Sequence, residues 1–186
     1  MKFCSACGHA VTLRIPENDD RERHVCDGCD AIHYHNPKVI VGCLPLWADK
    51  VLLCKRAIEP RYGFWTLPAG FMENAETTLE GACRETWEEA RAKVERPTLY
   101  TIFDLPDINQ VYMFYRGDLI GPEFGSGPES LEVALFDEAE IPWDHLAFPV
   151  VTETLHHYFE DRRSGVYPVH SRELRRDAWK RMKRSH

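Results

Sequence analysis

The strongest constraint on the fold lies in residues 70–92, which read GFMENAETTLEGACRETWEEARA. Thr77 and Glu80 have the spacing of a capping box, in which each side chain hydrogen-bonds to the backbone of the other residue. A helix is therefore expected from Thr78 to Ala90. At about 100° per residue, its small and apolar positions fall on one face, which is predicted to pack on a core. These positions are Leu79, Ala82, Cys83, Thr86 and Ala90.

A second face of the same helix gathers Glu85, Glu88 and Glu89 within one turn. Like-charged neighbours on a helix repel each other by a few tenths of a kcal/mol per pair, so the cluster costs stability unless a cation neutralises it. Carboxylate oxygens together with substrate phosphates are the ligands that Mg²⁺ prefers. The cluster predicts a site for magnesium, or manganese in its place.

The spacing of the fixed residues is more specific than the cluster alone. The pattern G-x5-E-x7-R-E-x2-E-E is filled by Gly70, Glu76, Arg84, Glu85, Glu88 and Glu89. Six such positions match by chance roughly once in ten million starting points, so the pattern resembles the Nudix box. Three lesser positions of the box depart from it: Thr86, Arg91 and Ala92. Glycine in place of Arg91 would end the helix in a left-handed conformation, so Arg91 implies modest strain or a longer helix.

The resemblance implies an α/β fold, a Nudix-type α/β/α sandwich with a mixed sheet, and Mg-dependent hydrolysis of a nucleoside diphosphate derivative. It implies that Glu85 and Glu89 are the main magnesium ligands, Glu88 a further ligand or a base, and Gly70 a backbone contact. Arg84 and Glu76 would orient the carboxylates. In this family the general base often lies outside the box. The candidates here are Glu129 and Glu132, with a slight preference for Glu132.

Four cysteines near the N-terminus, Cys4, Cys7, Cys26 and Cys29, form two C-x2-C pairs separated by eighteen residues. That spacing is typical of a four-thiolate zinc site, with iron as the second choice. Residues 1–36 have few apolar side chains to bury, so their fold needs a bound metal for stability. A site with all four positions filled by protein holds the fold together and does not catalyse.

Further along the chain, strand-like and helix-like patterns alternate. Residues 39–47 and 51–55 read as a hairpin around a polar turn, and a second helix is expected after Pro149. Other strand-like runs are residues 99–103, 110–115 and 131–136, and the composition of 117–127 favours a loop. We therefore expect a zinc ribbon at 1–36, a hydrolase domain at 37–163 and a basic tail at 164–186.

Charge and hydropathy limit the partners. The net charge is −7, and residues 161–186 hold nine Lys or Arg against three Asp or Glu, so the body is acidic. This argues against general nucleic-acid binding. The basic tail is read as a solvated, partly frayed helix, with contact to RNA or an anionic partner as the alternative. Its cations are Arg172, Arg175, Arg176, Lys180, Arg181, Lys183 and Arg184. The sequence has no apolar run of about 18 residues and no secretory signal, which predicts a soluble, cytoplasmic protein without a membrane partner. A homodimer is the default expectation.

The resemblance extends over most of residues 3–150, to a ribbon-bearing Nudix subgroup that includes FAD diphosphatases and NADH pyrophosphatases. NADH pyrophosphatases carry an SQPWPFPxS array that residues 93–110 lack. FAD or ADP-ribose is therefore the expected substrate, with release of AMP. The alternatives are an NADH or NAD-cap pyrophosphatase and a non-catalytic nucleotide sensor. Candidate substrate contacts are Arg56, Arg61, Trp65 and Ala69, with Phe64 or Tyr112 as further stacking rings. For each aromatic side chain, a place in the core is the alternative.

Overall fold

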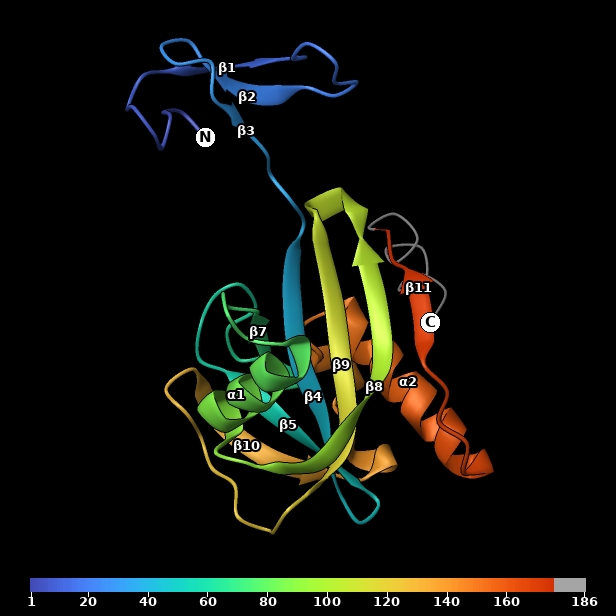
Figure 1. The fold of residues 1–186 in the computed structure, drawn as a ribbon. Helices are drawn as coiled ribbons and strands as arrows, with labels where there is room; N and C mark the ends of the chain where they lie inside the picture. Colours follow the sequence, from blue (N-terminus) through green and yellow to red (C-terminus); the bar gives the residue numbers. More distant parts are fainter. Residues whose placement is uncertain (176–186) are drawn as a thin grey trace. The chain divides into compact units, whose positions relative to one another are not determined.

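The computed structural model describes residues 1–175 of the chain. Contacts between Cα atoms divide it into two compact units, Met1–Pro37 and the part from Lys38 onward. Each unit has its own sheet (Figure 1).

The first unit is a small antiparallel sheet in the order β1-β2-β3. Its strands are β1 (Val11–Arg14), β2 (Arg23–Cys26) and β3 (Ile32–His33). Its buried apolar side chains are Cys4, Val25 and Cys26. So few buried groups leave the unit dependent on its cysteines.

The second unit is built on a mixed sheet in the order β10-β5-β4-β9-β8-β11. The strands are β4 (Lys38–Trp47), β5 (Lys50–Arg56), β8 (Val94–Leu105), β9 (Gln110–Leu119), β10 (Ser130–Phe136) and β11 (His170–Glu173). Two short strands extend it, β6 (Trp65–Thr66) beside β5 and β7 (Ala69–Phe71) beside β4. β4 runs parallel to β9 and β11 parallel to β8, while the other pairs are antiparallel.

Helices cover both faces of this sheet, so the unit has three layers (Figure 1). α1 (Thr78–Ala90) packs through Ala82 on Val41 and Cys43 of β4. α2 (Pro149–Ser164) packs on the opposite face, where Leu44 and Leu46 of β4 point. Successive side chains of a strand point to opposite faces, which explains how one strand serves both helices. The expected α/β/α sandwich with a mixed sheet is confirmed. Up to residue 175, the unit also has three short 3-10 helices, at Pro106–Ile108, Glu138–Glu140 and Trp143–His145.

The helix predicted at Thr78–Ala90 has the expected ends. Thr77 is its N-cap and forms the capping box with Glu80, and Arg91 adopts the left-handed conformation at φ 51°. The prediction of its buried face is partly wrong, because Leu79 is 38% exposed, whereas Gly81 and Glu89 are buried. α1 approaches β4 so closely that a Cβ on Gly81 would lie 2.8 Å from Val41 Cγ2. The face of α1 that packs against the sheet is therefore the face that carries glycine, the smallest residue of the helix.

The hairpin predicted around residues 48–50 joins β4 to β5, with Leu46 opposite Val51. The loop expected at 117–127 starts later, since β9 runs to Leu119. The helical reading of the tail is wrong at His170–Glu173, which forms β11. There Arg172 pairs with Glu153 at 2.7 Å. The tail cations from Arg176 to Arg184 lie outside the described residues. Within residues 1–175, no helix is long and apolar enough to cross a membrane.

Candidate functional site

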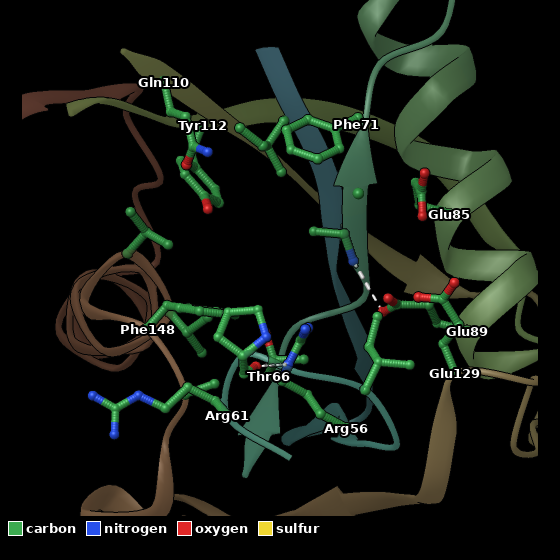
Figure 2. Close-up of a pocket in the computed structure, with 18 of the residues that line it drawn as sticks. Arg56, Arg61, Thr66, Phe71, Glu85, Glu89, Gln110, Tyr112, Glu129 and Phe148 are labelled. Atoms are coloured by element: carbon green, nitrogen blue, oxygen red, sulfur yellow. Dashed lines mark hydrogen bonds between the residues drawn. The ribbon is translucent and has the colours of Figure 1, made fainter. Parts of the chain in front are cut away.

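A cleft of about 900 Å³ opens in the second unit between the end of β7, the helix α1 and the N-terminus of α2. Figure 2 shows acidic side chains from α1 and the loop before β10 on one side, and Gln110, Tyr112 and Phe148 on the other. The cleft thus has a carboxylate end and an end lined by apolar and aromatic groups.

The carboxylate end holds Glu85, Glu88, Glu89 and Glu129. Glu89 is buried, and the backbone N–H of Ala69 donates a hydrogen bond of 3.2 Å to its Oε2. Burial raises the pKa of Glu89 to about 8, and it also raises the pKa of Glu85. Removing carboxylates from water costs free energy unless a cation compensates. This end of the cleft is therefore suited to a divalent cation.

Arg84 holds the acidic residues of α1 in place. Its Nε and Nη2 donate to the two carboxylate oxygens of Glu76 at 2.9 and 2.8 Å. Its Nη1 donates to Glu85 at 2.7 Å and to Glu88 at 3.2 Å. The hydrogen bonds from Arg84 lower the pKa of Glu76 to about 2. Glu76 thus remains charged and fixes the guanidinium, which in turn orients two carboxylates of the cleft.

Gly70 lies where only a glycine fits. A Cβ at this position would lie 2.4 Å from the carboxylate of Glu85. The carboxylate therefore rests against the backbone of β7, and the space beside it stays open for a ligand. Gly70 thus lies beside Glu85, and its expected role as a backbone contact stays a prediction.

The loop that carries Glu129 is anchored on the end of α1. Gly125 and Gly127 donate backbone hydrogen bonds to the carbonyls of Ala90 and Glu89 at 2.8 and 3.0 Å. A Cβ on Gly127 would lie 1.7 Å from the carbonyl oxygen of Glu88. The backbone carbonyl of Glu129 also accepts a hydrogen bond of 2.8 Å from Ala57. These contacts bring Glu129 to the cleft.

Of the two acids considered as a base, the structure places Glu129 in the cleft and Glu132 outside it. The Oε2 of Glu132 lies 3.5 Å from Lys55 Nζ, and its side chain is 56% exposed. The preference for Glu132 is not supported by this placement, because its position on β10 directs the side chain to solvent.

Arg56 and Arg61 line the cleft, as proposed from the sequence. Arg56 is held by a hydrogen bond from Nε to the carbonyl of Pro60 at 2.9 Å, and its guanidinium lies 5.0 Å from the centre of the Phe148 ring. Burial raises the pKa of both Glu89 and Tyr112, and the positive charge of Arg56 partly offsets this rise at each of them. Arg61 extends away from the carboxylates (Figure 2).

Trp65 does not line the cleft. It is 9% exposed and packs edge-on against Phe136, with 4.8 Å between ring centres. Of the two roles considered for Trp65, the structure supports the place in the core and not the substrate contact, because β6 pairs with β5 and turns this ring inward. Phe64 likewise lies outside the cleft, whereas Tyr112 lies in it.

Sequence reasoning missed Gln110 and Phe148, both of which line the cleft. Gln110 shares a strand face with Tyr112, because residues two apart in a strand point the same way. The alternation puts Gln110 on the same side of β9 as Tyr112, but the pairing of β9 with β4, which the local sequence does not reveal, brings that side to the cleft. Phe148 precedes Pro149 at the start of α2, and nothing in the local sequence marks it as a cleft residue.

The first unit holds a separate cluster. The ligand atoms of Cys4, Cys7, Cys26 and Cys29 lie within 4.8 Å of one another. The Sγ–Sγ distances are 3.8 Å for Cys4–Cys29, 3.4 Å for Cys7–Cys26 and 3.4 Å for Cys7–Cys29. A tetrahedron with Zn–S bonds of about 2.3 Å requires roughly 3.8 Å between sulfurs, so the thiols fit zinc after small shifts. His33 Nε2 lies 3.3 Å from Cys4 Sγ.

Two family models match the chain. The model described as Nudix N-terminal, a zinc ribbon, matches residues 2–35, and the model described as NUDIX domain matches residues 36–160. Together they match residues 2–160, which include nearly all of the first unit and most of the second.

Known proteins give the same picture. An ADP-ribose pyrophosphatase of Methanocaldococcus jannaschii is 31% identical over 119 residues, 60% of this chain and 70% of that protein. An NAD-capped RNA hydrolase NudC of Edwardsiella ictaluri is 28% identical over 135 residues, 72% of this chain and 50% of that protein. This chain thus spans only about half the length of NudC.

Among solved structures, a NUDIX hydrolase from Nitrosomonas europaea is 56% identical, with a TM-score of 0.91 over 95% of this chain and 100% of that chain. A bifunctional NMN adenylyltransferase/ADP ribose pyrophosphatase from Francisella tularensis, complexed with AMP and a manganese ion, has a TM-score of 0.60 at 19% identity. It covers 69% of this chain and 42% of that chain, and shows a likeness of fold alone.

Proposed function

The chain belongs to the NUDIX family of pyrophosphohydrolases, and from this premise we propose that it cuts the diphosphate of FAD or ADP-ribose and releases AMP. One observation carries the proposal: the acidic cluster of Glu85, Glu88, Glu89 and Glu129 lines the same cleft as the cation of Arg56, and this cleft also has apolar walls. The carboxylates suit a divalent ion, Arg56 suits a phosphate, and the apolar walls suit a ring or a sugar.

We assign the divalent ion to Glu85, Glu88 and Glu89, with the backbone of Gly70 beside them. Glu89 is buried and Glu85 is half-buried, and burial raises the pKa of both, which supports a cation beside them. A magnesium or manganese ion there would supply positive charge to the diphosphate oxygens and make the attacking water more acidic.

The chain's own groups do the rest. Arg84 orients Glu85 and Glu88, and the Ala69 N–H orients Glu89. Glu129, which is anchored beside α1, accepts the proton of the attacking water at its carboxylate. Arg56 offers its guanidinium to a diphosphate oxygen on the side away from the acids. Positioning and charge compensation are the main requirements for in-line attack on phosphorus.

The zinc ion is assigned to Cys4, Cys7, Cys26 and Cys29. Four thiolates that fill a tetrahedron leave no open position for water, so this ion stabilises the first unit and takes no part in hydrolysis.

ADP-ribose is supported by the archaeal relative, whose name carries that activity. A second candidate, removal of an NAD cap from RNA, is supported by the names of the NudC relatives. Nucleic acid therefore remains among the substrates to be compared, despite the acidic body.

The test is a magnesium-supplemented screen of FAD, ADP-ribose, NADH, NAD and NAD-capped RNA, read as kcat/KM for release of AMP or of a 5′-monophosphate end. The proposal predicts the highest kcat/KM for FAD or ADP-ribose. A higher kcat/KM for NAD-capped RNA would show that removal of the NAD cap, the second candidate, is the better description of the function. No hydrolysis of any of them, with the nucleotides still bound, would make the protein a sensor.

A further inference from the structure

The end of the cleft away from the carboxylates has its own composition. We call it the ring subsite, and its lining is Leu105, Ile108, Gln110, Tyr112, Phe148 and Leu174. Resting on the proposed function, we propose that the ring subsite binds the adenine of the substrate and that Gln110 recognises the edge carrying the 6-amino group.

The placement of the lining residues supports a planar occupant. Gln110 and Tyr112 stand on one face of β9, and Phe148, the N-cap residue of α2, lies on the same side of the cleft (Figure 2). Aromatic side chains offer faces on which a base stacks, worth about 1–3 kcal/mol per base. Ile108 is 40% exposed, so an apolar side chain faces water here until an occupant covers it. A flat ring would bury these surfaces.

Arg56 links the two ends of the cleft. Its guanidinium lies over Phe148, and it lines the same cleft as Glu89. A diphosphate held between the acids and Arg56 would direct the attached nucleoside toward Tyr112 and Gln110. The order along the cleft is therefore metal ligands, phosphate contact and ring contact.

Gln110 supplies the specificity. Within residues 1–175, its side-chain amide has no hydrogen-bond partner, although it lines the cleft. An amide offers one donor and one acceptor side by side, which matches the neighbouring acceptor nitrogen and amino group of adenine. The charged groups of this region are engaged with each other, since Arg175 pairs with Asp107 at 3.5 Å. That leaves the amide to bind the ring edge.

Adenine is also the ring that FAD and ADP-ribose share. A site that serves either substrate gains most from recognising the common part. The flavin of FAD has a comparable edge of donors and acceptors, so it is the competing occupant that the experiment must separate.

The experiment compares AMP with purine riboside 5′-monophosphate, which lacks the 6-amino group, by calorimetric titration in the presence of magnesium. The wild type is expected to bind AMP about tenfold more tightly, the lower range for a good amide–adenine pair. In Gln110→Leu the two ligands should bind equally, because the acceptor for the amino group is gone. Asp118→Leu, an exposed change on the same strand, should retain the tenfold preference. If Gln110→Leu fails to fold, Gln110→Met makes the same comparison.

Three results would overturn the inference: equal binding of the two ligands by the wild type, a preference that survives in Gln110→Leu, or no AMP binding. Weakened binding of FMN with AMP unchanged in Gln110→Leu would assign the ring subsite to the flavin instead. None of these titrations needs turnover. If the protein releases AMP from ADP-ribose but the titrations give a contradicting result, only this inference is wrong. If the titrations give the expected result but no nucleotide is hydrolysed, only the proposed function is wrong.

Discussion

Arg84 donates two parallel hydrogen bonds to Glu76, from Nε to Oε2 at 2.9 Å and from Nη2 to Oε1 at 2.8 Å. The same guanidinium reaches Glu85 at 2.7 Å. Glu76 itself lies outside the group of acids that we assign to the metal, and it acts by fixing the arginine that orients them.

Glu76→Gln should therefore lower kcat without removing a metal ligand. The amide cannot accept both hydrogen bonds, so Arg84 is held less firmly and Glu85 loses its fixed orientation. Loss of an orienting group around a metal site typically costs about 10- to 100-fold. Steady-state kinetics with ADP-ribose measures the effect. Glu95→Gln, an exposed change on β8, is the control, and an equal loss there would show that charge alone matters.

The same pair predicts a pH dependence of stability. Arg84 lowers the pKa of folded Glu76 from 4.5 to about 2, so its contribution is present above pH 4.5 and is lost as the pH falls toward 2. Urea midpoints of the wild type should fall across this window more steeply than those of Glu76→Gln. Parallel pH profiles of the two proteins would contradict the pairing.

The burial of Glu89 has the opposite effect on how stability depends on pH. Its folded pKa is about 8, so in the absence of metal the folded state is progressively disfavoured as the pH rises from 4.5 to 8. Glu89→Gln removes that charge and keeps an acceptor for the Ala69 N–H. The metal-free variant should therefore melt at a higher temperature than the metal-free wild type at pH 8 and at the same temperature at pH 4. A wild type that melts higher at pH 8 would mean that the charge is already compensated.

Gly127 tests the anchoring of Glu129. An alanine methyl group would lie 1.7 Å from the Glu88 carbonyl oxygen, so the loop must move away from α1 and carry Glu129 with it. We expect kcat for Gly127→Ala to fall at least about tenfold, within the range of general-base contributions. Gly125→Ala is a matched control, because a Cβ there meets no atom within 4 Å. Similar activities of the two variants would argue against the anchoring.

Zinc removal should act on the first unit alone. A strong thiol-competing chelator is expected to expose residues within 1–37 to proteolysis, while fragments of the second unit persist, because the first unit has few buried apolar groups. Mass mapping of the cleavage sites measures this. Cleavage beginning in the second unit would contradict the assignment.

Local patterns predicted α1 and the hairpin well, because a capping box and an alternation of side chains depend on neighbours in sequence. They failed where distant segments decide. Glu129 and Glu132 look alike in sequence, and the choice depends on Gly127 meeting the backbone of Glu88. Gln110 joins the cleft through the parallel pairing of β9 with β4, and Trp65 leaves it because β6 pairs with β5. No local signal encodes those pairings.

The account depends most on the carboxylates of α1 acting on a diphosphate. The most direct measurement is the single-turnover rate of AMP release from ADP-ribose by Glu89→Gln at saturating magnesium, beside a thermal melt of the same protein. We predict a rate lowered by about 10³-fold, the upper range for loss of one charge-stabilising group, with a cooperative melt retained. A rate within a few fold of the wild type, in a folded protein, would contradict the account.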